Sequence, residues 1–131
     1  MNNESGIAYE EREYHNFTGV IMWGENEGIV ESANFRLILS ENSICYIEFF
    51  SGIWKKGVWL HGVWQGGTWE DGRWERGLWD NGIWKNGVWE YGTWYGGTWY
   101  GGIWKGGIWY GGDDRNGKFH KTSPVRWRKV K

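Results

Sequence analysis

The chain has 131 residues, enough for one domain, and an unusual composition with 23 glycines, 14 tryptophans, one proline and one cysteine. An aromatic content of 20% argues against intrinsic disorder, no apolar run reaches the ~18 residues of a membrane helix, and a lone Cys45 excludes an internal disulfide framework. The net charge of −1 divides into −7 over residues 1–50, +1 over 51–112 and +5 over 113–131.

The first fifty residues are expected to form an acidic N-terminal cap. Met1 to Glu13 is polar and acidic and therefore unlike a secretory signal, so we expect synthesis in the cytoplasm. Within it, Glu10–Tyr14 is expected to begin a short helix. Phe35–Ser40 and Ser43–Phe50 are apolar and rich in strand-forming residues, with Glu41-Asn42 as a turn between them. They form either the irregular start of the repeat region that follows or a hairpin that closes it.

Residues 52 to 111 are twelve unbroken copies of a five-residue unit, Gly-x-Trp-x-x. An α-helix is a poor host for this unit, because tryptophans at this spacing would spiral around it and each glycine would cost about 1 kcal/mol. The unit fits a short extended segment better. The tryptophans are Trp54, Trp59, Trp64, Trp69, Trp74, Trp79, Trp84, Trp89, Trp94, Trp99, Trp104 and Trp109.

Each unit is predicted to be a three-residue strand followed by a turn. Ten of the twelve residues between Gly and Trp are β-branched, as strands prefer, and the exceptions are Arg73 and Leu78. The turn positions contain pairs such as Asp71-Gly72 and Asn81-Gly82, which tolerate positive φ. Since the Trp position never varies, we predict that Trp points inward, with the glycine beside it making room. Outward tryptophans would form an apolar patch larger than soluble monomers show.

A chain that turns in the same sense once in every unit must wind into a coil. Successive coils would stack at roughly 4.8 Å through strand hydrogen bonds. Four units would make a quadrilateral coil and three units a triangular coil, and the spacing does not choose between them. Each buried indole N–H needs an acceptor, and we expect carbonyl groups at the corners to serve. The fold class is therefore all-β, a β-solenoid.

The Gly-x-Trp-x-x pattern resembles the pentapeptide-repeat family, in which a central Leu or Phe points inward and a small residue stands two positions earlier. That resemblance covers about half of the chain and implies a right-handed, quadrilateral β-helix. The chain departs from the family in having Trp at the centre and Ile, Val or Thr just before it, where the family usually has Asp or Asn. Degenerate units continue outside the strict run. Counted back from Trp54 in steps of five, Phe49, Ile44 and Leu39 fit the pattern, Asn34 interrupts it and Ile29 fits again. Counted forward from Trp109, Phe119 fits and Asp114 stands at the position between them.

No pattern in the sequence indicates catalysis. His15, His61 and His120 are scattered, the single cysteine gives no metal-ligand spacing, and phosphate-binding or dinucleotide-binding signatures are missing. The acidic residues of the repeats stand at turn positions, where solubilising charge is the ordinary explanation. We therefore expect no enzyme activity, no cofactor and no metal site.

Two surfaces are candidates for binding. Exposed tyrosines with little charge nearby suit contact with protein or carbohydrate, although repeat duplication alone would also enrich them. This candidate face consists of Tyr91, Thr93, Tyr95, Thr98, Tyr100 and Tyr110. The region 113–131 is expected to be a C-terminal cap and basic tail, which is either solvated or docks on an acidic partner. The candidate docking residues are Arg126, Trp127, Arg128, Lys129 and Lys131.

The sequence therefore favours a non-catalytic structural or protein-interaction module, such as a component of a phage virion or appendage. Its acidic head and basic tail suggest head-to-tail stacking of copies, an open-ended arrangement that forms filaments. A glycan-binding module that uses the tyrosine-rich face is one alternative. The resemblance implies another, a DNA mimic that binds topoisomerases, but the near-neutral repeat body disfavours it. Nucleic-acid binding by the basic tail is a weak expectation.

Overall fold

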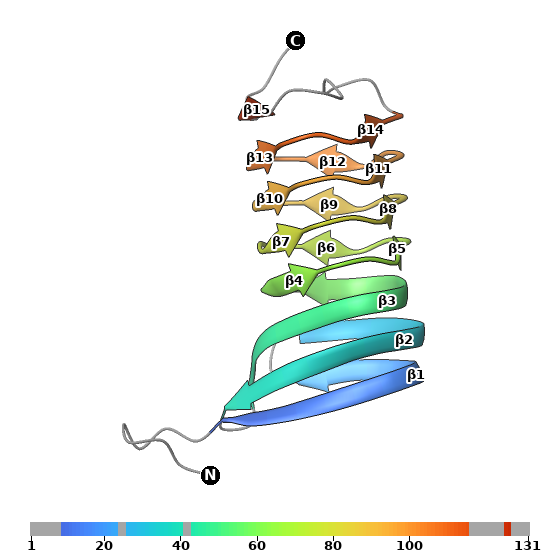
Figure 1. The fold of residues 1–131 in the computed structure, drawn as a ribbon, viewed down its shortest axis with the longest axis vertical. Helices are drawn as coiled ribbons and strands as arrows, with labels where there is room; N and C mark the ends of the chain where they lie inside the picture. Colours follow the sequence, from blue (N-terminus) through green and yellow to red (C-terminus); the bar gives the residue numbers. More distant parts are fainter. Residues whose placement is uncertain (1–8, 24–25, 41–42, 116–124, 127–131) are drawn as a thin grey trace.

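The computed structural model describes residues 9–23, 26–40, 43–115 and 125–126, and within these ranges every helix or strand is a β-strand. Figure 1 shows two parts that share one axis, a curved sheet of three long strands at the N-terminal end and a stack of short strands above it. The long strands are β1 (Glu10–Trp23), β2 (Asn26–Ser40) and β3 (Ser43–Trp59). The chain is an all-β solenoid of about five coils.

The three N-terminal strands form an antiparallel meander, with β2 paired to β1 on one edge and to β3 on the other. The strands expected over 35–40 and 43–50 are confirmed within β2 and β3, while the turn expected at Glu41-Asn42 lies outside the described residues. The helix expected over Glu10–Tyr14 is wrong, because these residues pair with Phe35 to Leu39 of β2. Long-range pairing with an apolar strand overrides the weak local helix propensity.

Strand β3 joins the two parts of the molecule. Nearly its whole length, from Ser43 to Val58, pairs antiparallel with β2, and it also pairs in parallel with three short strands of the next coil. The segment is therefore both the closing strand of the N-terminal meander and the first coil of the solenoid. The two arrangements that the sequence left open occur together.

The remaining strands are short, and most consist of the residue before Trp and the Trp itself. A three-residue strand was expected for each unit, and only β4 has that length. The short strands are β4 (Gly62–Trp64), β5 (Thr68–Trp69), β6 (Arg73–Trp74), β7 (Leu78–Trp79), β8 (Ile83–Trp84), β9 (Val88–Trp89), β10 (Thr93–Trp94), β11 (Thr98–Trp99), β12 (Ile103–Trp104), β13 (Ile108–Trp109), β14 (Asp113–Asp114) and β15 (Val125–Arg126).

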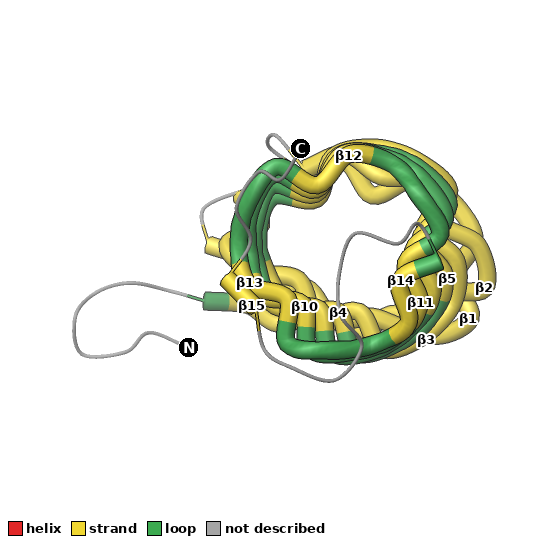
Figure 2. Tube along the Cα trace, turned by 90° about the horizontal axis from the view of Figure 1, so that it is seen from above, coloured by secondary structure: helices red, strands yellow, loops and turns green. Residues whose placement is uncertain are grey.

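Three repeat units complete one coil. Parallel partners stand ~15 residues apart, as with Trp64 and Trp79, Trp69 and Trp84, or Trp74 and Trp89. Figure 2 shows the resulting three stacks of strands at different sides of the wall. The resemblance implied four units per coil, and the pairing register corrects that number to three. Two backbone hydrogen bonds of about 2.8–3.0 Å tie most units to the coil below.

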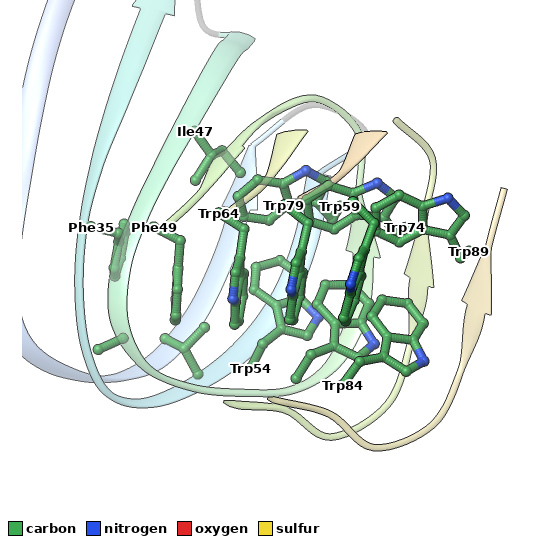
Figure 3. Close-up of a cluster of buried hydrophobic side chains, with 14 of the residues drawn as sticks. Phe35, Ile47, Phe49, Trp54, Trp59, Trp64, Trp74, Trp79, Trp84 and Trp89 are labelled. Carbon is green, nitrogen blue, oxygen red and sulfur yellow. The ribbon is translucent and has the colours of Figure 1, made fainter. Parts of the chain in front are cut away.

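The prediction that Trp points inward is confirmed, since each of the twelve repeat tryptophans is at most 3% exposed. Paired indoles of successive coils stack with centroids 4.7–5.2 Å apart and planes within 7° of parallel. Indoles of consecutive units meet edge to face at 5.6–5.9 Å. Both are favoured arrangements of aromatic rings. One column continues toward the N-terminal end through Phe49 and Phe35 (Figure 3). The ring of Tyr14 stacks on Phe35 and extends the column by one more residue.

The repeat glycines are needed for the conformation and close approach of the backbone more than for the space occupied by the neighbouring indole. All twelve have φ between +108° and +144°, a region that L side chains rarely adopt. A Cβ on Gly82 would lie 2.5 Å from the carbonyl oxygen of Gly67 in the coil below, while an indole nitrogen is farther away at 3.1 Å. The expectation that these glycines make room for Trp is corrected accordingly. It does apply to Gly28, outside the repeats, where a Cβ would collide with the ring of Trp54.

The indole N–H groups of nine repeat tryptophans, from Trp54 to Trp94, divide into two sets. Four of them, from Trp79, Trp84, Trp89 and Trp94, donate to a corner carbonyl 17 residues ahead at 3.0–3.1 Å, as expected. In all four cases the acceptor residue is a glycine. In the lower coils the equivalent corner residue is Asp, Arg, Asn or Tyr, and the indole nitrogens there have no acceptor among the described protein atoms. These are the nitrogens of Trp54, Trp59, Trp64, Trp69 and Trp74.

Candidate functional site

The titratable side chains of the described residues are dispersed. None of their His, Cys, Asp and Glu side chains form a group of three that could hold a metal ion. His15 of β1 is paired with Glu13, His61 follows β3, and His120 lies outside the described residues. The described residues also include no helix long and apolar enough to cross a membrane.

The charged side chains of the repeats pair along the outside of the solenoid. Arg73 lies 2.8 Å from a carboxylate oxygen of Glu75 and 3.2 Å from one of Glu90, which Lys105 approaches at 3.7 Å. These ion pairs lie along one side of the solenoid, from β6 to β12. Both cations are about half exposed, so the pairs stabilise the fold little.

His61 is the histidine with a perturbed environment. Burial lowers its pKa below the usual value of 6.5, and the positive charge of Arg76 lowers the pKa further. The ring meets the edge of Tyr46 with centroids 5.7 Å apart. Burial also raises the pKa of Tyr46. The two rings form a packing contact between β3 and the turn that follows it.

The six residues of the expected binding face divide between two sides of the solenoid. Tyr91 ends the unit of β9 at the corner before β10, Thr93 and Tyr95 belong to the unit of β10, and Tyr110 follows β13 directly above. Thr98 and Tyr100 belong to β11, which stacks in a different column with β8 and β14. Figure 2 places the β10–β13 column and the β11–β14 column on separate sides. We use "tyrosine face" below for the first group with its neighbour in β13: Tyr91, Thr93, Tyr95, Ile108 and Tyr110.

The tyrosine face is ordered by ring contacts. The rings of Tyr95 and Tyr110 stack with centroids 5.1 Å apart and an angle of 8° between planes. The ring of Tyr91 lies against Gly106 of the next coil, where an added Cβ would be 3.4 Å from it. Tyr91 is 58% exposed, the largest exposure of any tyrosine in the repeats. None of the five side chains is charged, so the face is aromatic, uncharged and already organised.

The side of the solenoid that contains Thr98 and Tyr100 differs from the tyrosine face in its contacts with charged groups. The guanidinium of Arg115 lies over the ring of Tyr100, 5.8 Å from its centroid, and the same side chain pairs with Asp113 at 2.8 Å. Cation–π contact of this kind occupies the ring face that a ligand would use. Tyr100 and Thr98 therefore have charged side chains among them, while the five residues of the tyrosine face are themselves uncharged and have charged neighbours at its border, such as Glu90 before Tyr91 and Arg76 and Asp80 around Leu78 one coil below.

At the C-terminal end of the solenoid an aspartate replaces the repeat tryptophan, and strand β15 runs in the opposite direction to the strands below. Asp114 takes the place of a tryptophan in the register, pairs with Trp99 and is 8% exposed. Strand β15 then runs antiparallel along β13, so that Val125 pairs with Trp109 and Arg126 with Ile108. The remaining candidate docking residues, Trp127, Arg128, Lys129 and Lys131, lie outside the described residues, and the docking role of the tail stays a prediction.

An apolar surface at the N-terminal end was not predicted from the sequence. Val20 and Met22 of β1 are 52% and 63% exposed, and both border two hollows with volumes of about 280 and 370 Å³. The first hollow is lined by Tyr14, Phe17, Val20, Ile21, Met22, Phe35 and Leu37. The signal in the sequence was a run from Asn16 to Trp23 without any charge, inside a head with a net charge of −7.

Comparison with known proteins adds no relative to this description. A scan against protein-family models found no match, and searches of curated proteins and of solved structures found none either. The regular spacing of the tryptophans and the parallel coils are compatible with a pentapeptide-repeat solenoid.

Proposed function

We propose that the chain is a non-catalytic structural and protein-interaction module that presents the tyrosine face to a protein partner. The observation that supports this most directly is the uncharged cluster of Tyr91, Tyr95 and Tyr110 on one side of the upper coils. Tyrosine is enriched and charge depleted at the centres of protein interfaces. The partner surface that fits is therefore uncharged, with apolar and hydrogen-bonding groups.

The architecture suits such a role because the invariant residues of the repeat form the core and the corners. All twelve tryptophans are buried, and the glycines hold the corners, so only the variable positions reach the surface. The stacked rings of Tyr95 and Tyr110 are ordered before any partner arrives. Binding then loses less side-chain entropy than it would with free rings, which is how preorganisation raises affinity.

Site-specific crosslinking in cells that make the protein tests the proposal. A photoreactive phenylalanine analogue replaces Thr93, at the centre of the face, and the matched control replaces Leu78, its partner one coil below. Leu78 stands between the charged residues Arg76 and Asp80, so the two positions differ in surface chemistry and share backbone geometry. We expect a protein adduct at Thr93 that is lost in the Tyr91→Ala, Tyr95→Ala variant. Equal adducts at both positions, or none at Thr93, would overturn the proposal.

Glycan binding is the second candidate, favoured by the exposure of Tyr91, since sugars stack on exposed aromatic faces. The stacking of Tyr95 on Tyr110 counts against it, because each ring covers one face of the other. A glycan array probed with the wild type and with Tyr91→Ala decides between the candidates. Binding that disappears in Tyr91→Ala supports a glycan ligand, while a blank array removes it.

A further inference from the structure

The first strand, β1, has one edge that pairs with β2, and the described residues contribute no strand to its other edge. Its two halves differ in chemistry. The first half contains the charged run Glu10, Glu11, Arg12 and Glu13, and the second half, from Asn16 to Trp23, has no charge. Edge strands can template pairing with another chain, and charges or irregular pairing usually prevent it.

This protection ends before Gly19. The charges lie in the first half of β1, and register shifts interrupt the pairing with β2 between Tyr14 and Phe17 and again between Phe17 and Gly19, as β-bulges do. From Gly19 to Trp23 the pairing is continuous, with Val20 opposite Ile29 and Ile21 opposite Gly28 of β2. The second half is therefore a regular, apolar edge next to the open end of the core.

Both hollows at this end reach the second half of β1. Ile21 is buried toward the core, while Val20 and Met22 are exposed. The first hollow is lined by these three residues together with residues of β2 that include Phe35 and Leu37. The second hollow lies across the three long strands, because it is lined by residues of β2 and by Lys56 of β3 beside Val20 and Met22. A strand added to the free edge of β1 would carry its own apolar side chains into the first hollow.

The geometry points to a second copy of this chain as the occupant, with the two β1 strands paired antiparallel about Ile21. In this register Val20 of each copy lies opposite Met22 of the other, so the exposed apolar side chains cover one another. The acidic halves run away from the two-fold axis in opposite directions, which keeps Glu10, Glu11 and Glu13 of the two copies apart. A parallel arrangement would set these carboxylates side by side and be repelled.

This self-pairing is independent of the tyrosine face and differs from head-to-tail stacking. The same patch is used on both copies, so the assembly closes at two chains, whereas a head-to-tail contact continues into a filament. The buried groups are apolar and both heads are acidic, so added salt does not weaken the dimer. Head-to-tail contact between acidic and basic ends would weaken as salt screens the charges.

Light scattering after size-exclusion chromatography tests the inference, with protein concentration varied and NaCl raised from ~0.1 to ~1 M. We expect a particle of twice the chain mass at all salt concentrations, and a monomer for Val20→Lys with Met22→Lys. The control is Ile103→Lys, an equally exposed apolar residue of β12, which should remain dimeric. A monomeric wild type, open-ended particles that dissolve in salt, or loss of the dimer in the control would overturn the inference.

Disulfide trapping tests the register and stays informative if the lysine variant fails to fold. Val20→Cys and Met22→Cys are prepared separately in a Cys45→Ser background, then mixed and oxidised. Because Val20 lies opposite Met22 across the axis, the mixture should give at least several times more covalent dimer than either variant alone. Equal yields would refute the antiparallel pairing about Ile21. An Ile103→Cys and Lys105→Cys mixture, with the same spacing around Trp104, gives the background yield.

Discussion

Replacing one repeat glycine by alanine tests the structural reason for the whole pattern. Gly82 has φ +127°, and a Cβ there would lie 2.5 Å from the carbonyl oxygen of Gly67. Holding a non-glycine residue in such a region costs of order 1–3 kcal/mol. Forcing a methyl group into a packed contact costs a further ~1–3 kcal/mol. The lower entropy of unfolded alanine offsets about 0.4–1 kcal/mol, so Gly82→Ala should lower the free energy of unfolding by about 2–5 kcal/mol.

Gly96 provides the matched control because it occupies a neighbouring corner without a positive φ. A Cβ on Gly96 would lie 3.5 Å from the carbonyl oxygen of Asp80, an ordinary contact. Gly96→Ala should therefore leave stability unchanged or raise it by up to about 1 kcal/mol. Urea denaturation followed by near-ultraviolet circular dichroism measures both. Equal destabilisation by the two variants would refute the backbone explanation, and a neutral Gly82→Ala would show that the corner accepts a side chain.

Three further outcomes follow from the core and the surface. Trp84→Ala should cost about 3–5 kcal/mol in urea denaturation, and Trp84→Phe less, because a ring would remain in the stack. Since the pKa of His61 is lowered by burial and by Arg76, protonation favours the unfolded chain. The free energy of unfolding should fall as pH drops below about 6.5, and His61→Gln should flatten that part of the pH profile. Arg73→Gln should cost less than about 1 kcal/mol, a loss that ~1 M NaCl should abolish in thermal melts.

The repeat made the main features of the fold predictable. A residue that never varies through twelve copies belongs in the core, and all twelve tryptophans are buried there. Residues that alternate with Trp, such as Ile103, reach the surface because successive residues of a strand point to opposite sides. The corner carbonyls that accept indole N–H groups were also predictable, although among Trp54 to Trp94 they serve just the four indoles whose corner residue is glycine.

The size of the coil was harder to predict because it depends on how the chain turns at each glycine. A five-residue repeat is equally compatible with three or four units per coil, and the pairing of Trp64 with Trp79 shows that three units complete one coil. The role of the glycines was mistaken for the same reason, since sequence shows neither φ nor the approach of Gly67 to Gly82. Strand β1 was partly misread because its form depends on a partner, β2, that starts beyond it in the chain.

The distribution of glycine links the core of the upper coils to their surface. Gly96, Gly106 and Gly111 each accept an indole N–H through their carbonyl groups. The same residues have no side chain, so they leave bare corners around the tyrosine face, and Gly106 lies directly against the ring of Tyr91. In the lower coils the corners carry Asp71, Arg76, Asn81 and Asn86, which bring polar groups to the surface and leave the indoles below without an acceptor.

Glycine at the corner therefore has two correlates. The buried indoles whose corner residue is glycine donate to its carbonyl group, a hydrogen bond worth roughly 1 kcal/mol, and the surface at that corner has neither charge nor bulk. Tyr91 is the exception within the tyrosine face, because it occupies the corner 17 residues ahead of Trp74, whose indole has no acceptor among the described protein atoms. The most exposed ring of the face thus stands at a corner without this hydrogen bond, while Tyr95 and Tyr110 stand beside corners that have it.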